Sequence, residues 1–83
     1  MAAVVIPFPI TRRRDFIRRS AARLAETAPS TAEKLLAHTI TIQIDTMTRR
    51  GIAPDLIAQQ ARALKTAIRG ELWRQLILEG GAA

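Results

Sequence analysis

Apolar residues recur along most of the chain at intervals of three and four, which is the spacing of one face of an α-helix. This pattern predicts three helices, over residues 11–27, 31–50 and 54–79. Residues 1–10 are expected to be extended, because two prolines fix their own φ angles and push the preceding residues out of the α region. The sequence therefore predicts an all-α protein with one small domain, residues 1–83.

Capping residues mark the starts of the first two helices. Thr11 is a candidate N-cap for the first helix, and Pro29 is expected to stop that helix. Ser30 and Glu33 have the spacing of a capping box, in which each side chain bonds a free backbone N–H of the other residue. The second helix is therefore expected to begin just after Ser30.

The link between the second and third helices is short and has clear turn chemistry. Gly51 suits the left-handed position that follows a last helical turn. Pro54 suits the first turn of a helix, and Asp55 complements its positive end. Because only residues 51–53 connect them, the two helices are expected to form a long antiparallel hairpin.

One segment of the second helix also has the pattern of a strand. Residues 39–44 read Thr-Ile-Thr-Ile-Gln-Ile, a β-branched alternation that is typical of a β-strand in isolation. A lone strand would have no partner in this chain, and apolar residues of the same helix keep helical spacing. A helix is therefore expected here. The residues with helical spacing are Ala32, Leu36, Ile40, Ile44 and Met47.

The first and third helices each have an apolar face that is expected to form the core. The core residues expected are Ile17, Ala21, Leu24, Ala28, Ile57, Ala61, Leu64 and Ile68. In the third helix this stripe drifts through Leu72 and Leu76, while Trp73 and Ile77 open a second face.

The second helix has an unusually wide apolar arc, with Leu35 and Ile42 on one side of it. A helix that is apolar over more than half of its circumference needs two neighbours. The other two helices could provide them, and so could a second subunit. Leu35 and Ile42 are therefore the candidate interface of a homodimer.

The composition supports oligomerisation and an acidic partner. A chain of 83 residues buries a modest core, and with no cysteine it has no disulfide to add stability. The net charge is +6, and six arginines but only two carboxylates lie within residues 1–29. Such a concentration of positive charge favours nucleic acid, an acidic protein or an anionic membrane as partner.

Two rows of basic residues, each with an aromatic residue nearby, are the candidate contact surfaces. An aromatic ring among arginines can stack on a base, or it can pack inside the chain. The favoured interpretation is that Phe16 packs against the N-terminal segment or another helix, and that Trp73 packs against the first helix or Pro7-Phe8-Pro9. Phe8 and Trp73 are candidate apolar anchors for a protein partner. The candidate partner-binding residues are Phe8, Arg12, Phe16, Arg19, Arg23, Arg62, Lys65, Arg69 and Trp73.

The chain offers little for catalysis. Its single histidine, His38, has no carboxylate three or four residues away that could orient the ring or share a metal. The seven carboxylates are scattered, and the four glycines do not form a phosphate-binding loop. We therefore expect no enzyme activity, no catalytic residue, no metal and no cofactor.

Nothing in the chain predicts a membrane span or a secretion signal. No stretch approaches about 18 apolar residues, and the basic residues follow the first apolar run instead of preceding it. The absence of cysteine also fits a reducing compartment. A cytoplasmic protein without integral membrane association is expected.

Several short motifs together resemble a known family. They are Pro7-Phe8-Pro9, Arg12-Arg13-Arg14, Ala21-Ala22-Arg23, Leu36-Ala37-His38, Arg49-Arg50-Gly51-Ile52 and Glu71-Leu72-Trp73-Arg74. The chain resembles a family of short uncharacterised bacterial proteins over nearly its whole length. The resemblance implies a free-standing cytoplasmic protein that is helical through residues 39–44, and it implies no activity or cofactor. Gly70 departs from the helix-forming residue expected there.

The leading hypothesis is a non-catalytic helical interaction protein, a regulator, adaptor or inhibitor that binds an acidic partner protein. The alternative is a small basic protein that binds nucleic acid. Two features weaken that alternative. The second and third helices are too long for a compact helix-turn-helix, and the aromatic content, 4%, is low. An anionic-membrane binder is the least favoured, because the first helix has alanines on its apolar face.

Overall fold

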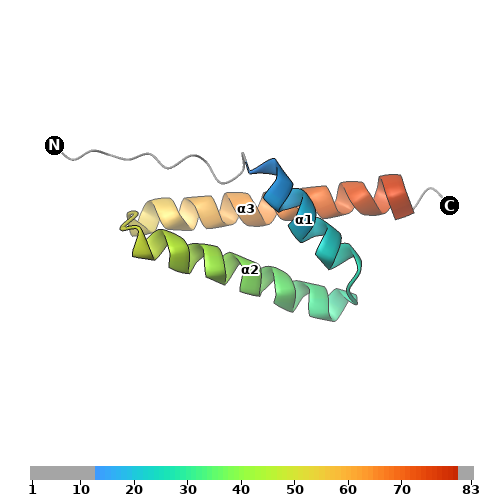
Figure 1. The fold of residues 1–83 in the computed structure, drawn as a ribbon, viewed down its shortest axis with the longest axis horizontal. Coiled ribbons are helices and arrows are strands. Elements are labelled where there is room, and N and C mark those ends of the chain that lie inside the picture. Colours follow the sequence, from blue (N-terminus) through green and yellow to red (C-terminus); the bar gives the residue numbers. More distant parts are fainter. Residues whose placement is uncertain (1–12, 81–83) are drawn as a thin grey trace.

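The computed structural model describes residues 13–80 and shows three α-helices, in agreement with the predicted all-α fold. The helices are α1 (Arg14–Ala25), α2 (Pro29–Arg49) and α3 (Pro54–Gln75), as drawn in Figure 1. A π-helical turn, Leu76–Gly80, continues α3. No strand occurs within the described residues. The predicted extended segment, residues 1–10, lies outside them.

Helix α1 is shorter than predicted at both ends. It begins at Arg14, with Arg13 in the N-cap position and no side-chain capping hydrogen bond, so the predicted N-cap at Thr11 is wrong. Asp15 lies in the first turn, where its charge complements the positive end of the helix dipole. The helix ends at Ala25, two residues before the predicted end.

The predicted capping box at the start of α2 is also wrong. Helix α2 begins at Pro29, and its N-cap residue is Ala28, which makes no side-chain capping hydrogen bond. Proline fits the first helical position because its φ is already helical and its missing N–H would have no partner there. Ser30 therefore lies inside the first turn, and Ala28, predicted to be buried, is exposed in the link.

The α2–α3 hairpin forms as predicted. Gly51 has a φ of 76° and donates its backbone N–H to the carbonyl of Thr48 at 3.0 Å. Ile52 donates its N–H to the carbonyl of Met47 at 3.1 Å, which completes a Schellman motif. Pro54 is the first residue of α3. The chain therefore reverses within a few residues, and the two long helices run antiparallel in Figure 1.

Residues 39–44 are helical, which confirms the predicted helix there. The threonines of α2 use their hydroxyl groups locally. Each of four donates a hydrogen bond of 2.9–3.0 Å to the carbonyl four residues earlier. Side chains that would favour a strand are thus accommodated inside the helix. The four threonines are Thr39, Thr41, Thr46 and Thr48.

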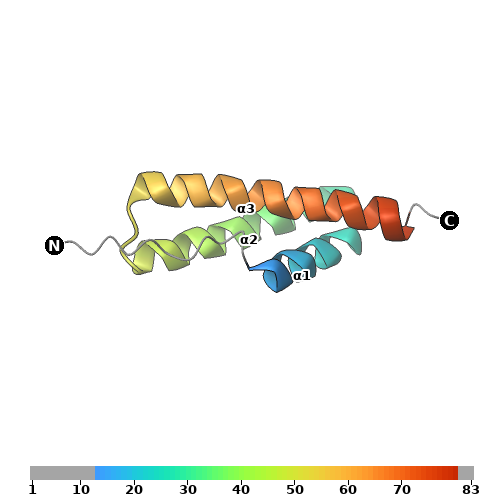
Figure 2. The same ribbon diagram turned by 90° about the horizontal axis from the view of Figure 1, so that it is seen from above.

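The core lies where all three helices meet. Helix α1 crosses the C-terminal half of α3 and descends to the start of α2, as the two views in Figures 1 and 2 show. Leu64 and Ile68 of α3 are completely buried in this cluster. The other buried residues of the cluster are Ile17, Ala21, Leu24 and Leu36. Met47, Ile57 and Ala61 are buried nearer to the hairpin turn, where only α2 and α3 form the core.

Candidate partner-binding surfaces

Trp73 is the largest exposed side chain of α3. Its exposed fraction is 66%, so Trp73 does not pack into the helical core, and the expectation that it anchors α1 is wrong. The reason is its position on the helix. Trp73 follows Ile68 by five residues, which turns it by about 140° around the axis from the buried stripe. Trp73 therefore lies outside the helical core of the described residues. The other expectation, contact with Pro7-Phe8-Pro9, lies outside the described residues.

Three further large apolar side chains are exposed three to five residues after Trp73. The exposed fractions are 40% for Leu76, 54% for Ile77 and 58% for Leu78. We call Trp73 and these three residues the apolar end of α3. In Figure 1 this end of α3 extends beyond α1. The prediction of contact residues missed Leu76, Ile77 and Leu78. The signal that could have found them is four large apolar residues within six positions.

A shallow depression lies beside Trp73, between α3 and the start of α2. It is lined by Glu33, Thr66, Arg69, Gly70, Leu72 and Trp73. A Cβ atom added to Gly70 would meet nothing within 4 Å, and the backbone there is helical. Within the described residues nothing requires glycine at this position, although glycine costs about 1 kcal/mol relative to alanine inside a helix.

The predicted basic row on α3 borders this depression. Arg69 pairs with Glu33 of α2 at 2.7 Å, with side chains that are 51% and 67% exposed. Such an exposed ion pair stabilises the fold by only about 0–1 kcal/mol. Arg62 and Lys65 are exposed, and neither forms an ion pair with another residue of the described part of the chain.

The predicted basic row on α1 is only partly described. Arg19 and Arg23 are exposed, whereas Arg12 and Phe8 lie outside residues 13–80. Phe16 is half-buried and packs against the core, which agrees with its favoured position. The guanidinium carbon of Arg13 lies 4.7 Å from the centroid of the Phe16 ring, within the range of a cation–π interaction. Phe16 is therefore not a free stacking surface.

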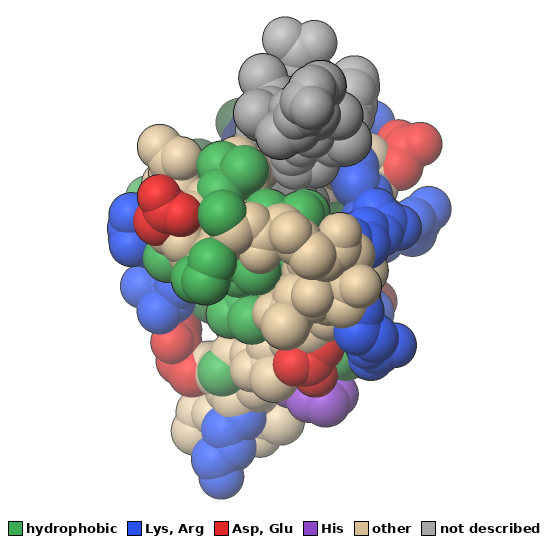
Figure 3. Space-filling view, turned by 90° about the vertical axis from the view of Figure 1, so that its left-hand side faces the viewer, with side chains coloured by type: hydrophobic (Ala, Val, Ile, Leu, Met, Phe, Trp, Pro, Cys, Tyr) green, Lys and Arg blue, Asp and Glu red, His purple; other side chains and the backbone are tan. Residues whose placement is uncertain are grey.

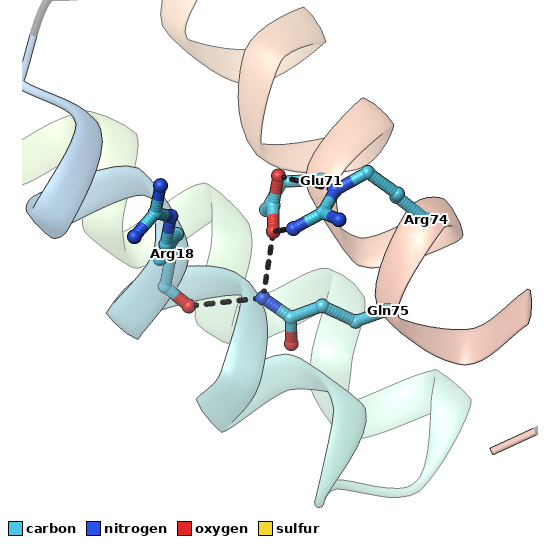
Figure 4. Close-up of polar contacts among 4 residues, drawn as sticks. All are labelled: Arg18, Glu71, Arg74 and Gln75. Atoms are coloured by element: carbon cyan, nitrogen blue, oxygen red, sulfur yellow. Dashed lines mark hydrogen bonds and ion pairs between the residues drawn. The ribbon is translucent and has the colours of Figure 1, made fainter. Parts of the chain in front are cut away.

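A polar cluster fixes α3 against α1. As Figure 4 shows, Arg74 binds both carboxylate oxygens of Glu71, through Nε at 3.1 Å and Nη2 at 2.6 Å. Gln75 donates its Nε2 to Glu71 at 3.1 Å and to the backbone carbonyl of Arg18 at 3.3 Å. The hydrogen bonds from Arg74 and Gln75 lower the pKa of Glu71 from 4.5 to about 2. This cluster joins α1 and α3.

The two basic rows do not form one continuous surface. Arg69 faces α2, because its partner is Glu33. Glu71 and Gln75, which face α1, lie on the opposite flank of α3. The cations of α3 therefore border the hairpin side of the molecule, away from the exposed arginines of α1.

The two residues of the predicted homodimer interface differ in exposure. Leu35 is half-buried and packs against the core of its own chain. Ile42 is 46% exposed. Figure 3, seen from the hairpin end, shows hydrophobic side chains reaching the surface between polar ones, with basic side chains along its edges.

His38, the one histidine, is exposed on α2. Within residues 13–80, no group of three or more histidine, aspartate or glutamate side chains is placed to hold a metal ion. No helix in that same part of the chain is both long and apolar enough to cross a membrane.

Comparison with known proteins shows the family of the chain. No curated protein and no solved structure matches it. The model of one family does match, and the match covers residues 1–83. The protein therefore belongs to the DUF6074 family, a family of unknown function.

Proposed function

We propose that the protein is a non-catalytic interaction protein that binds an acidic partner protein and acts as its regulator, adaptor or inhibitor. One observation carries this proposal. Trp73, which is 66% exposed, begins a run of exposed apolar side chains on a chain with a net charge of +6. Monomeric proteins rarely expose a contiguous apolar patch larger than a few hundred Å² unless the patch binds something, and we propose that the apolar end of α3 is such a patch.

The chemistry of the patch suits a protein partner. Tryptophan and arginine are the side chains most enriched among residues that dominate binding energy, and such residues need burial at the centre of an interface. The apolar end of α3 could provide that centre. Arg62 and Lys65 lie on the same helix, and rim charges of this kind mainly speed the encounter with a partner of opposite charge.

The test begins with the partner itself. Tagged protein is used to isolate the bound partner from cells that contain both, and the affinity of the purified pair is then measured. Trp73→Ala should weaken binding by roughly 30-fold or more, as expected for a central anchor. Thr48→Ala, which shortens an exposed side chain near the end of α2, is the matched control and should change little. An unchanged affinity for Trp73→Ala would remove the basis of the proposal.

Nucleic acid is the competing ligand, and the same preparation tests it. Duplex and single-stranded nucleic acid are titrated at several salt concentrations. Loss of each cation that contacts a phosphate should lower the log–log salt slope by about 0.7 to 0.9. Submicromolar binding near physiological salt, abolished by charge reversal of Arg62 and Lys65, would show that nucleic acid and not an acidic protein is the ligand.

Self-association is a separate part of the proposal. We propose that a second copy contacts the exposed side of α2 at Ile42. Leu35 contributes to its own core, so it supports this interface less than the sequence predicts.

A further inference from the structure

The outer side of α3 has a second stripe of evenly spaced residues. Its positions alternate between steps of three and four, which is the a/d spacing of a coiled-coil heptad. All of them are exposed or half-buried, and none belongs to the core stripe of α3. We call this set the outer stripe. It consists of Leu56, Gln59, Ala63, Thr66, Gly70, Trp73 and Ile77.

The outer stripe has the shape of a seat for another helix. Its middle positions, Ala63, Thr66 and Gly70, are small, while Trp73 and Ile77 at one end are large and exposed. The distance between packed helices depends on the side chains at their contact, so small residues permit a close approach. A helix lying over Gly70 would fill the space that is open there and cover one face of Trp73.

The charges beside the outer stripe distinguish between possible occupants. Arg69 is balanced by Glu33, and Glu71 binds Arg74. Arg62 flanks the stripe and has no ion pair with any residue from 13 to 80, so it leaves positive charge beside the stripe. A second copy of α3 would add another unpaired Arg62 without supplying an acidic partner. A helix with acidic residues next to its apolar positions would complement Arg62, as flanking charges do in coiled coils.

We propose that the outer stripe docks an acidic amphipathic helix, with its closest approach at Gly70 and with Trp73 packed against its apolar face. This inference rests on the proposed function and specifies which surface the acidic partner uses and what structure the partner presents. Arg62 flanks the docked helix and selects glutamate or aspartate beside its apolar positions.

Two designed peptides test the proposal directly. Both are helices of roughly 28 residues with leucine at the a and d positions, long enough to be helical in water. One has glutamate at the flanking e and g positions, and the other has lysine there. Trp73 is the only tryptophan of the chain, so its fluorescence reports on the outer stripe alone. The glutamate peptide should shift the Trp73 emission to shorter wavelength with saturable binding, and the lysine peptide should not.

A variant at Gly70 tests the predicted close approach. Gly70→Leu should weaken the glutamate peptide at least tenfold by filling the space over which the helix lies. The variant should remain folded, because a Cβ there meets nothing within 4 Å and leucine favours helix more than glycine does. Ala37→Leu, which adds leucine at an exposed position of α2, is the matched control and should bind like the wild type.

Three results would overturn the inference. The first is equal binding of both peptides, and the second is unchanged binding to Gly70→Leu. The third is an emission shift that follows protein concentration without peptide, because a second copy would then cover the stripe. If the purified acidic partner still binds but is insensitive to Gly70→Leu, the partner uses another surface and the proposed function stands. If nucleic acid is the ligand, the proposed function fails as well.

Discussion

At the scale of single residues, two glycines of this protein have opposite roles. Gly51 has a φ of 76°, a conformation that costs other residues roughly 1–2 kcal/mol because their Cβ meets the backbone. Gly70 lies inside α3 with a helical backbone and open space around it. The same amino acid is therefore needed for the turn at one position and weakens the helix at the other.

Alanine at each position should separate these roles. Gly51→Ala should lower the free energy of unfolding by about 1–2 kcal/mol. Gly70→Ala should raise it by up to about 1 kcal/mol, because alanine is the better helix former and has room. Urea unfolding followed by circular dichroism measures both changes. Two changes of the same sign would contradict this account of the two glycines.

A second residue-scale prediction concerns Glu71 and pH. Its pKa is lowered from 4.5 to about 2 by hydrogen bonds from Arg74 and Gln75. A carboxyl group with a lowered pKa in the folded state stabilises the fold above its unfolded pKa and loses this effect as pH falls. The stabilisation should therefore be complete above pH 4.5 and disappear progressively toward pH 2.

Thermal unfolding between pH 6 and pH 2 checks this prediction. The difference in melting temperature between wild type and Glu71→Gln should shrink across the window. Glu26→Gln controls for general loss of charge, because Glu26 is exposed and forms no ion pair within residues 13–80. A difference that is constant with pH would mean that Glu71 acts through packing alone.

At the scale of elements, the α2–α3 hairpin could be predicted because its determinants are local. Gly51 and Pro54 act on the backbone next to them, and both lie where the sequence predicts. The start of α2 was harder to predict, because two neighbouring residues carry competing local signals. Ser30 favours a capping box, whereas Pro29 favours the first helical position. Proline determined the outcome because its fixed φ acts without a partner.

The main error about the candidate site concerns the expected packing of Trp73 against α1. Leu72 and Leu76 continue the apolar stripe of α3 while it drifts around the helix, so neighbouring apolar residues suggest a broad buried face. Only the position of α1 shows where burial ends. Because α1 packs against the side of Glu71 and Gln75, Trp73 is left outside. Contacts between distant elements of this kind have no signal in local spacing.

The element-scale prediction concerns α2 as a dimer interface. Ile42→Asp should dissociate a homodimer without unfolding the chain, because Ile42 is 46% exposed. Leu35→Asp should in addition destabilise the monomer, since Leu35 packs against the core. Sedimentation and circular dichroism of both variants separate the two effects. A wild type that is monomeric at high micromolar concentration would exclude the dimer.

At the scale of the whole molecule, a small core supports a long hairpin. All three helices meet around Leu64 and Ile68, whereas near the hairpin turn only α2 and α3 bury side chains together. Domains of this size have a total stability of only about 5–15 kcal/mol. Loss of one central side chain, as in Leu64→Ala, removes about 2–5 kcal/mol of that stability.

The strand-like pattern of residues 39–44 acquires its importance when α2 unfolds. Five of its six residues are β-branched, and the segment has no charge and no proline, which is the composition of amyloid-forming steric zippers. In the native helix its threonine hydroxyls are bonded to the backbone of their own turn. The native fold thus keeps an aggregation-prone segment from pairing with other chains.

Heating should therefore produce β-rich aggregates, and Leu64→Ala should form them faster because it populates the unfolded chain. Ile42→Lys should slow aggregation, since it places a charge in the segment at an exposed position of the native helix. Thioflavin fluorescence during heating measures all three proteins. Equal rates for wild type and Ile42→Lys would assign the aggregation to another segment. For a protein this small, the helix that displays Ile42 is also its protection against amyloid.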